Sequence, residues 1–129
     1  MGEHEALEST VREMFAAFDK VDIDAMLALV TPDAQGVDEI ARRWLRSADD
    51  ISAYVKELRP RISDVRSELS DMHSEQWGDT AVVTSWLEQD YTFDGERLHI
   101  AAPTTVVLRR QDGDWKLVLL HSVALPPEG

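Results

Sequence analysis

The sequence has no cysteine, which excludes disulfide bonds, iron–sulfur clusters and cysteine-based zinc sites. It also has no apolar run near the ~18 residues needed to span a membrane. The N-terminal MGEHEALEST is acidic and lacks the basic and then apolar order of a secretory signal. The histidines, at positions 4, 73, 99 and 121, show no short ligand spacing. We therefore expect a cytoplasmic protein with no membrane segment, no bound metal and no cofactor.

Positive charge is scarce. Lysine and arginine together number 13, against 25 aspartates and glutamates, which gives a formal net charge of -12. The resulting field repels phosphate backbones and anionic lipid, so neither nucleic acid nor a membrane surface is an expected partner. With 129 residues and 43% hydrophobic content, the chain is expected to form one domain over residues 1–129 with a single core.

Helices are predicted in the first half, where apolar residues recur at helical spacing. Residues 4–19 form the first helix of this pattern, and a second, shorter helix is capped by Asp22 and ends before Pro32. Ser47 begins a third helix that stops before Pro60. The apolar stripes expected to be buried are Leu7, Val11, Met14, Phe15 and Phe18, then Ile23, Met26, Leu27 and Val30, then Ile51, Tyr54, Val55 and Leu58.

Strands are predicted in the second half, where the hydrophobic period falls to about two. Four runs cover residues 65–77, 80–93, 97–110 and 115–125. The short turns between them, Gly78-Asp79, Asp94-Gly95 and Asp112-Gly113, imply antiparallel neighbours. Helices followed by such a meander indicate the α+β class, with three N-terminal helices packed on one face of a strongly curved, mainly antiparallel sheet.

This order, closing with DGDWKLVLLHSV, resembles the nuclear-transport-factor-2-like superfamily, and within it the SnoaL-like or ketosteroid-isomerase-like proteins. The segment AAFDKVDIDAMLALVTPDA resembles the two-helix entry of that family. The resemblance covers nearly the whole chain. It implies a cystatin-like cone with a pocket for a small apolar molecule, and an open sheet face that pairs two copies into a homodimer.

The resemblance also places an acid in the pocket. Counting on from Asp33 without a gap, Asp38 falls where ketosteroid isomerases carry their proton-transferring base, and a bulge would turn Glu39 inward instead. A carboxylate in an apolar pocket has its pKa raised by desolvation and can exchange a proton near neutral pH. Met14 and Thr104 stand where those isomerases carry the donors that stabilise an oxyanion. The sequence therefore argues against steroid isomerisation and keeps Asp38 as a pocket acid.

Other side chains are candidates for the same pocket, among them Met14 and Phe18 of the first helix and Thr104. His121 shares strand parity with Leu117 and Leu119 and is expected to point inward, where it either pairs with Asp38 or packs as a structural histidine. Arg43 and Trp44 either hold a substrate or belong to the surface.

Tyr54 and Trp86 are two further aromatic candidates for the pocket. Tyr54 lies on the inner stripe of the third helix. Trp86 and Tyr91 lie on opposite faces of one strand, and Trp86 is the expected pocket residue because of its size.

The acid at position 38 favours a cofactor-independent acid–base enzyme, an isomerase, cyclase or hydratase acting on an apolar or polyketide-like compound, whereas the missing oxyanion donors favour binding alone, and no motif decides between them. Two alternatives remain: a non-catalytic protein that binds an apolar ligand in the same pocket, and a dimeric assembly module.

Overall fold

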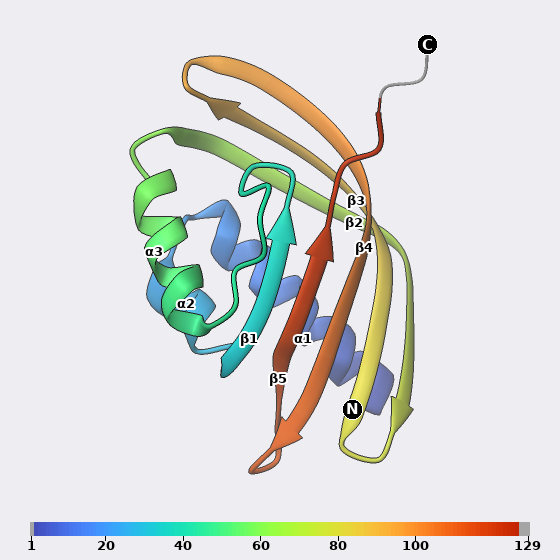
Figure 1. Ribbon diagram of the computed structural model, residues 1–129. Coiled ribbons are helices and arrows are strands. Elements are labelled where there is room, and N and C mark those ends of the chain that lie inside the picture. Colours follow the sequence, from blue (N-terminus) through green and yellow to red (C-terminus); the bar gives the residue numbers. More distant parts are fainter. Residues whose placement is uncertain (1, 127–129) are drawn as a thin grey trace.

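The computed structural model describes residues 2–126, and in it a bent five-stranded sheet wraps around three helices (Figure 1). The elements, in chain order, are α1 (Glu3–Asp19), α2 (Ile23–Leu27), β1 (Val30–Asp38), α3 (Ala48–Leu58), β2 (Ile62–Trp77), β3 (Thr80–Phe93), β4 (Glu96–Gln111) and β5 (Asp114–Ser122). The α+β class and the helix-filled concave sheet are therefore confirmed. Within residues 2–126, no helix is both long and apolar enough to cross a membrane.

The sheet has the strand order β1-β5-β4-β3-β2. β2 to β5 form an antiparallel meander, as predicted, whereas β1 pairs with β5 in parallel. β2 carries two register shifts against β3, next to Asp64 and Asp71, which both have a left-handed φ of 51°. Because bulges add twist and bend the strand that carries them, they help to curl this half of the sheet over the helices.

Local signals position α1 and α3 as expected. The Ser47 hydroxyl accepts a hydrogen bond from the amide of Asp50 at 3.1 Å and so caps α3. The prediction for the second helix was wrong at its end: α2 stops at Leu27, and Val30 begins β1 opposite Leu117. Pro32 therefore lies in a strand, which is tolerated because β1 is at the edge of the sheet.

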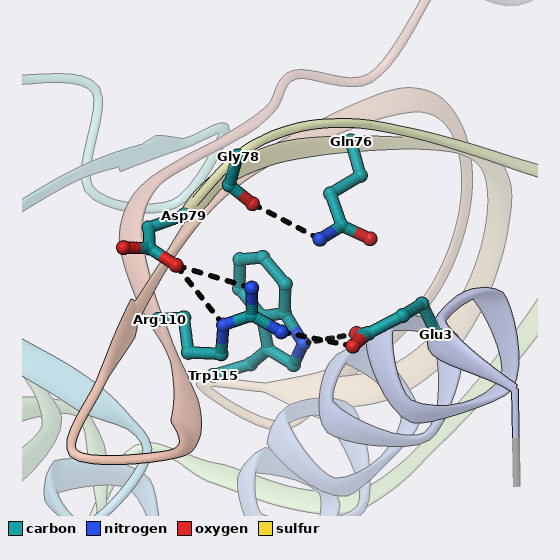
Figure 2. A network of polar contacts seen from close by, with 6 residues as sticks. All are labelled: Glu3, Gln76, Gly78, Asp79, Arg110 and Trp115. Carbon is teal, nitrogen blue, oxygen red and sulfur yellow. Dashed lines mark hydrogen bonds and ion pairs between the residues drawn. The ribbon is translucent and has the colours of Figure 1, made fainter.

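Arg110 and Trp115 of the sheet bind the N-terminus of α1 (Figure 2). Arg110 of β4 donates to Glu3 at 2.8 Å and to Asp79 at 3.1 Å, and its guanidinium carbon lies 5.0 Å from the centre of the Trp115 ring. The indole nitrogen of Trp115 donates to the other carboxylate oxygen of Glu3 at 3.1 Å. This cluster joins the start of the chain to the β2–β3 turn and to β5.

Candidate functional site

A cavity of about 100 Å³ lies between the helices and the concave face of the sheet. Its wall is mainly apolar and includes Met14, Phe15, Phe18, Met26, Leu87 and Leu117. An apolar cavity of ~150 Å³ holds a benzene molecule, so this one suits a ligand part of about one ring. The polar residues of the lining are Gln35, Asp38, Glu39, Tyr54, Gln89 and Ser122.

Asp38 is the last residue of β1 and lies opposite Ser122 of β5. Its Oδ1 accepts hydrogen bonds from the amides of Ile40 at 3.0 Å and Ala41 at 2.7 Å, which fixes a tight turn after the strand. The hydroxyl of Tyr54 lies 3.1 Å from both carboxyl oxygens. Among residues 2–126, Oδ2 accepts from Tyr54 alone, so this is the oxygen with capacity to take a proton from a ligand.

The environment of Asp38 disfavours its charged form. Burial raises the pKa of this carboxyl, and the hydrogen bonds from Ala41, Tyr54 and Ile40 only partly offset that rise. Burial raises the pKa of the Tyr54 hydroxyl, and the nearby Asp38 carboxylate raises it further. Tyr54 therefore remains a hydrogen-bond donor to Asp38 throughout the physiological pH range.

Glu39 also lines the cavity. Burial, reinforced by the neighbouring charge of Asp38, raises the pKa of Glu39 to about 7, although a hydrogen bond from Tyr91 lowers it. The sequence posed Asp38 and Glu39 as alternatives, but both face the cavity, because β1 ends at Asp38 and the strand alternation ends with it. The site thus presents two adjacent carboxyl groups of raised pKa at a mainly apolar cavity.

The structure brings four predicted site residues together in the lining: Met14, Phe18, Asp38 and Tyr54. Arg43 does not reach it and is exposed on the segment after β1. Thr104 is buried behind the wall, where its hydroxyl contacts Ser122 at 2.9 Å. Trp86 is placed on the outer face of β3, because Leu87, Gln89 and Tyr91 are the buried residues of that strand; the expectation that Trp86 faces the pocket was wrong.

His121 is exposed and lies outside the lining, so the expectation that it points inward was also wrong. The cause is a bulge in β5: Val107 pairs with Leu119 but Leu108 pairs with Leu117, so Val118 is an extra residue that reverses the alternation. The His121 ring instead lies 6.1 Å from the ring of Trp44, which is itself 42% exposed. Neither residue belongs to the lining of the cavity.

Sequence reasoning missed Gln89 and Ser122. Both are nearly inaccessible to solvent, at 4% and 3% exposure, and both line the cavity. A signal for Gln89 was present, because it shares strand parity with Leu87 and Tyr91 and is a polar residue at a core-facing position. Ser122 gave no such signal, since the bulge decides its direction. Within residues 2–126 no three histidine, aspartate or glutamate side chains gather as a metal site.

The comparisons with known proteins agree with this architecture. Residues 7–126 match the SnoaL-like domain family, and the chain belongs to that family. The fold is similar to a ketosteroid isomerase-like protein from Erwinia carotovora atroseptica SCRI1043 (TM-score 0.83, 21% identity, covering 97% of this chain and 98% of that chain). It is also similar to an NTF2-like protein from Cytophaga hutchinsonii (TM-score 0.83, 17% identity, 97% and 100% covered) and to the CaMKII hub of S. rosetta (TM-score 0.84, 22% identity, 97% and 98% covered). The curated proteins contain no significant match.

Proposed function

We propose that this SnoaL-like protein is a cofactor-independent acid–base enzyme that isomerises, cyclises or hydrates an apolar carbonyl compound, and that Asp38 is its base. The observation that carries the proposal is the pair of carboxyl groups, Asp38 and Glu39, placed side by side in an apolar cavity. Paired carboxyls in such surroundings can divide the roles of acid and base between them.

The two carboxyls have different partners, which supports different roles. Asp38, when ionised, takes a proton through Oδ2 from the carbon next to the ligand carbonyl, and Tyr54 keeps the carboxylate in place. The electrons of that carbon–hydrogen bond then move onto the carbonyl oxygen. With its pKa raised to about 7, Glu39 can hold a proton near neutral pH and donate it to that oxygen. Return of the proton from Asp38 to another carbon completes an isomerisation.

The experiment uses cyclohexanone, a small apolar ketone of one ring. Proton NMR in heavy water follows the exchange of the hydrogens next to the carbonyl, with wild type, Asp38→Asn and the control Asp33→Asn, an exposed acid on the same strand. We expect the Asp38→Asn variant to lose about a hundredfold or more of the protein-catalysed exchange, and Asp33→Asn to lose none. Binding of cyclohexanone without exchange by wild type would favour the alternative, a non-catalytic binding protein.

We also infer that two copies associate through the outer face of the sheet. On this face, half-buried Val82 and Trp86 of β3 lie opposite Val107 and Pro103 of β4. Apolar side chains gathered on one sheet face are typical of an interface, and a self-complementary patch gives a closed dimer. The similarity in fold to a CaMKII hub supports self-association.

A further inference from the structure

A chain of hydrogen bonds reaches from the cavity wall to the end of α1. The amide nitrogen Nε2 of Gln89 donates to the Ser67 hydroxyl oxygen at 2.9 Å. That hydroxyl donates in turn to Oδ1 of Asp19 at 2.6 Å, and the Ser67 backbone amide donates to Oδ2 of Asp19 at 3.1 Å. Residues from β3, β2 and α1 thus hold one another in a fixed arrangement.

The available protons fix the orientation of the Gln89 amide. A hydroxyl has a single proton, and that of Ser67 is given to a carboxylate that can only accept. Ser67 must therefore accept from Gln89, which turns Nε2 toward Ser67 and directs the carbonyl oxygen Oε1 away from it. Because Gln89 lines the cavity, Oε1 is the acceptor that its amide offers to a ligand, beside the second proton of Nε2.

Ser122, another uncharged polar residue of the wall, has its hydroxyl 2.9 Å from that of Thr104, and either oxygen can be the donor of this bond. In both cases Ser122 keeps a lone pair that can accept a hydrogen bond from a ligand. Gln89 and Ser122 thus give the wall acceptors that complement a ligand with a donor.

We propose that Gln89 determines specificity by accepting a hydrogen bond from a hydroxyl group of the ligand, so that the ligand is a hydroxylated apolar compound. The inference rests on the proposed use of this cavity for a small molecule and names the class of that molecule. A ligand without a hydroxyl would leave a buried acceptor unpaired, which is how a polar site rejects an apolar analogue.

The place of Gln89 suits this role. It lies two residues before Tyr91 on the same face of β3, roughly 7 Å along the strand, and it lines the same cavity as Asp38 and Glu39. Gln89 and the two carboxyls therefore belong to one cavity, which a single small ligand can occupy.

The test compares cyclohexanol with methoxycyclohexane, its methyl ether, which keeps the oxygen but has no proton to donate. Binding is measured by NMR titration of isotope-labelled protein. We expect wild type to bind cyclohexanol about fivefold more tightly than the ether, which corresponds to one net hydrogen bond. The side-chain amide signal of Gln89 should shift only with the alcohol.

Three variants locate the effect. Gln89→Met keeps the bulk of the side chain without its acceptor and should abolish the preference, whereas the control Gln76→Met, on β2 outside the lining, should retain it. Ser67→Ala retains the Gln89 side chain but releases its orientation, so the preference should fall without vanishing.

The outcome is independent of catalysis, because neither probe undergoes acid–base chemistry. Asp38→Asn should therefore keep the preference for cyclohexanol even though it removes the proposed base. Equal binding of alcohol and ether, no binding of cyclohexanol at tens of millimolar, or a preference that survives Gln89→Met would each overturn the inference. A preference lost in Asp38→Asn would overturn it as well, because the acceptor would then be the carboxyl.

Discussion

The hydroxyl of Tyr54, on α3, lies 3.1 Å from both carboxyl oxygens of Asp38, at the end of β1. This bond lowers the pKa of Asp38 against the larger effect of burial. We expect Tyr54→Phe to raise that pKa further and to destabilise the protein by about 1–3 kcal/mol, because a buried acceptor loses a donor. Carbon-detected NMR titration of the Asp38 carboxyl measures the first effect and thermal melting the second. In the control Tyr91→Phe, the pKa that moves should be that of Glu39; an unchanged or lower Asp38 pKa in Tyr54→Phe would refute the prediction.

Substitutions of Asp38 separate two effects on stability: the cost of its buried charge and the contribution of its hydrogen bonds to the turn. A carboxyl whose folded pKa is raised contributes stability below its unfolded pKa, and that contribution is lost as the pH rises through the folded pKa. At neutral pH the charge is therefore a cost of folding. Asp38→Asn, which keeps an oxygen for the amides of Ile40 and Ala41, should be as stable as wild type or more stable. Asp38→Ala should be less stable than Asp38→Asn by ~1 kcal/mol, because it loses both turn bonds. Thermal melts at pH 7 that show Asp38→Asn to be clearly destabilised would contradict this account.

Glu39 should make stability depend on pH. Its folded pKa of about 7 lies above the ordinary glutamate pKa of 4.5, so the folded state retains a proton that the unfolded state releases. Relative to Glu39→Gln, wild type should lose stability as the pH rises from 4.5 to 7 and then remain level, by on the order of 1–3 kcal/mol in total. Urea unfolding of both proteins across this range measures the difference. A difference that does not change with pH would mean that Glu39 titrates normally.

Arg110 should be sensitive even to replacement by lysine. Its guanidinium bonds Glu3 and Asp79 at once and lies over Trp115, and a single ammonium group cannot reproduce that geometry (Figure 2). We expect Arg110→Lys to lower the melting temperature of the protein. Arg43→Lys, on the exposed segment after β1, is the matched control and should have no effect. Similar melting temperatures for both variants would show that the cluster contributes little.

The outer sheet face provides the last prediction. Trp86 is half-buried there, in the middle of β3 opposite Pro103, so Trp86→Glu would place a charge within the proposed interface. Light scattering at tens of micromolar should find wild type as a dimer and Trp86→Glu as a monomer. Glu88→Gln, a milder change on the same face, should leave the dimer intact. A monomeric wild type would remove the interface proposal without affecting the cavity.

Much of the fold could be predicted because its signals are local. The cap at Ser47 and the alternation from Thr80 to Phe93 each depend on neighbouring residues, and both elements form as expected. The error at Val30 arose because a helical stripe and an edge strand share the same apolar residues, and pairing with Leu117 decided between them. The candidate site was harder, since strict alternation along β5 failed at Val118 and turned His121 outward.

The sequence by itself determined the class of fold, the exclusion of cysteine chemistry and the acid at the end of β1, because composition, periodicity and a family resemblance can be read along the chain. Only the tertiary structure decided which side chains surround that acid and how far it is buried. Tyr54 reaches Asp38 across 16 residues, and Ser67 reaches Asp19 across 48. Desolvation and hydrogen-bond direction depend on such distant partners, so the proton affinity of Asp38 and the orientation of Gln89 arise only when the helices close over the sheet.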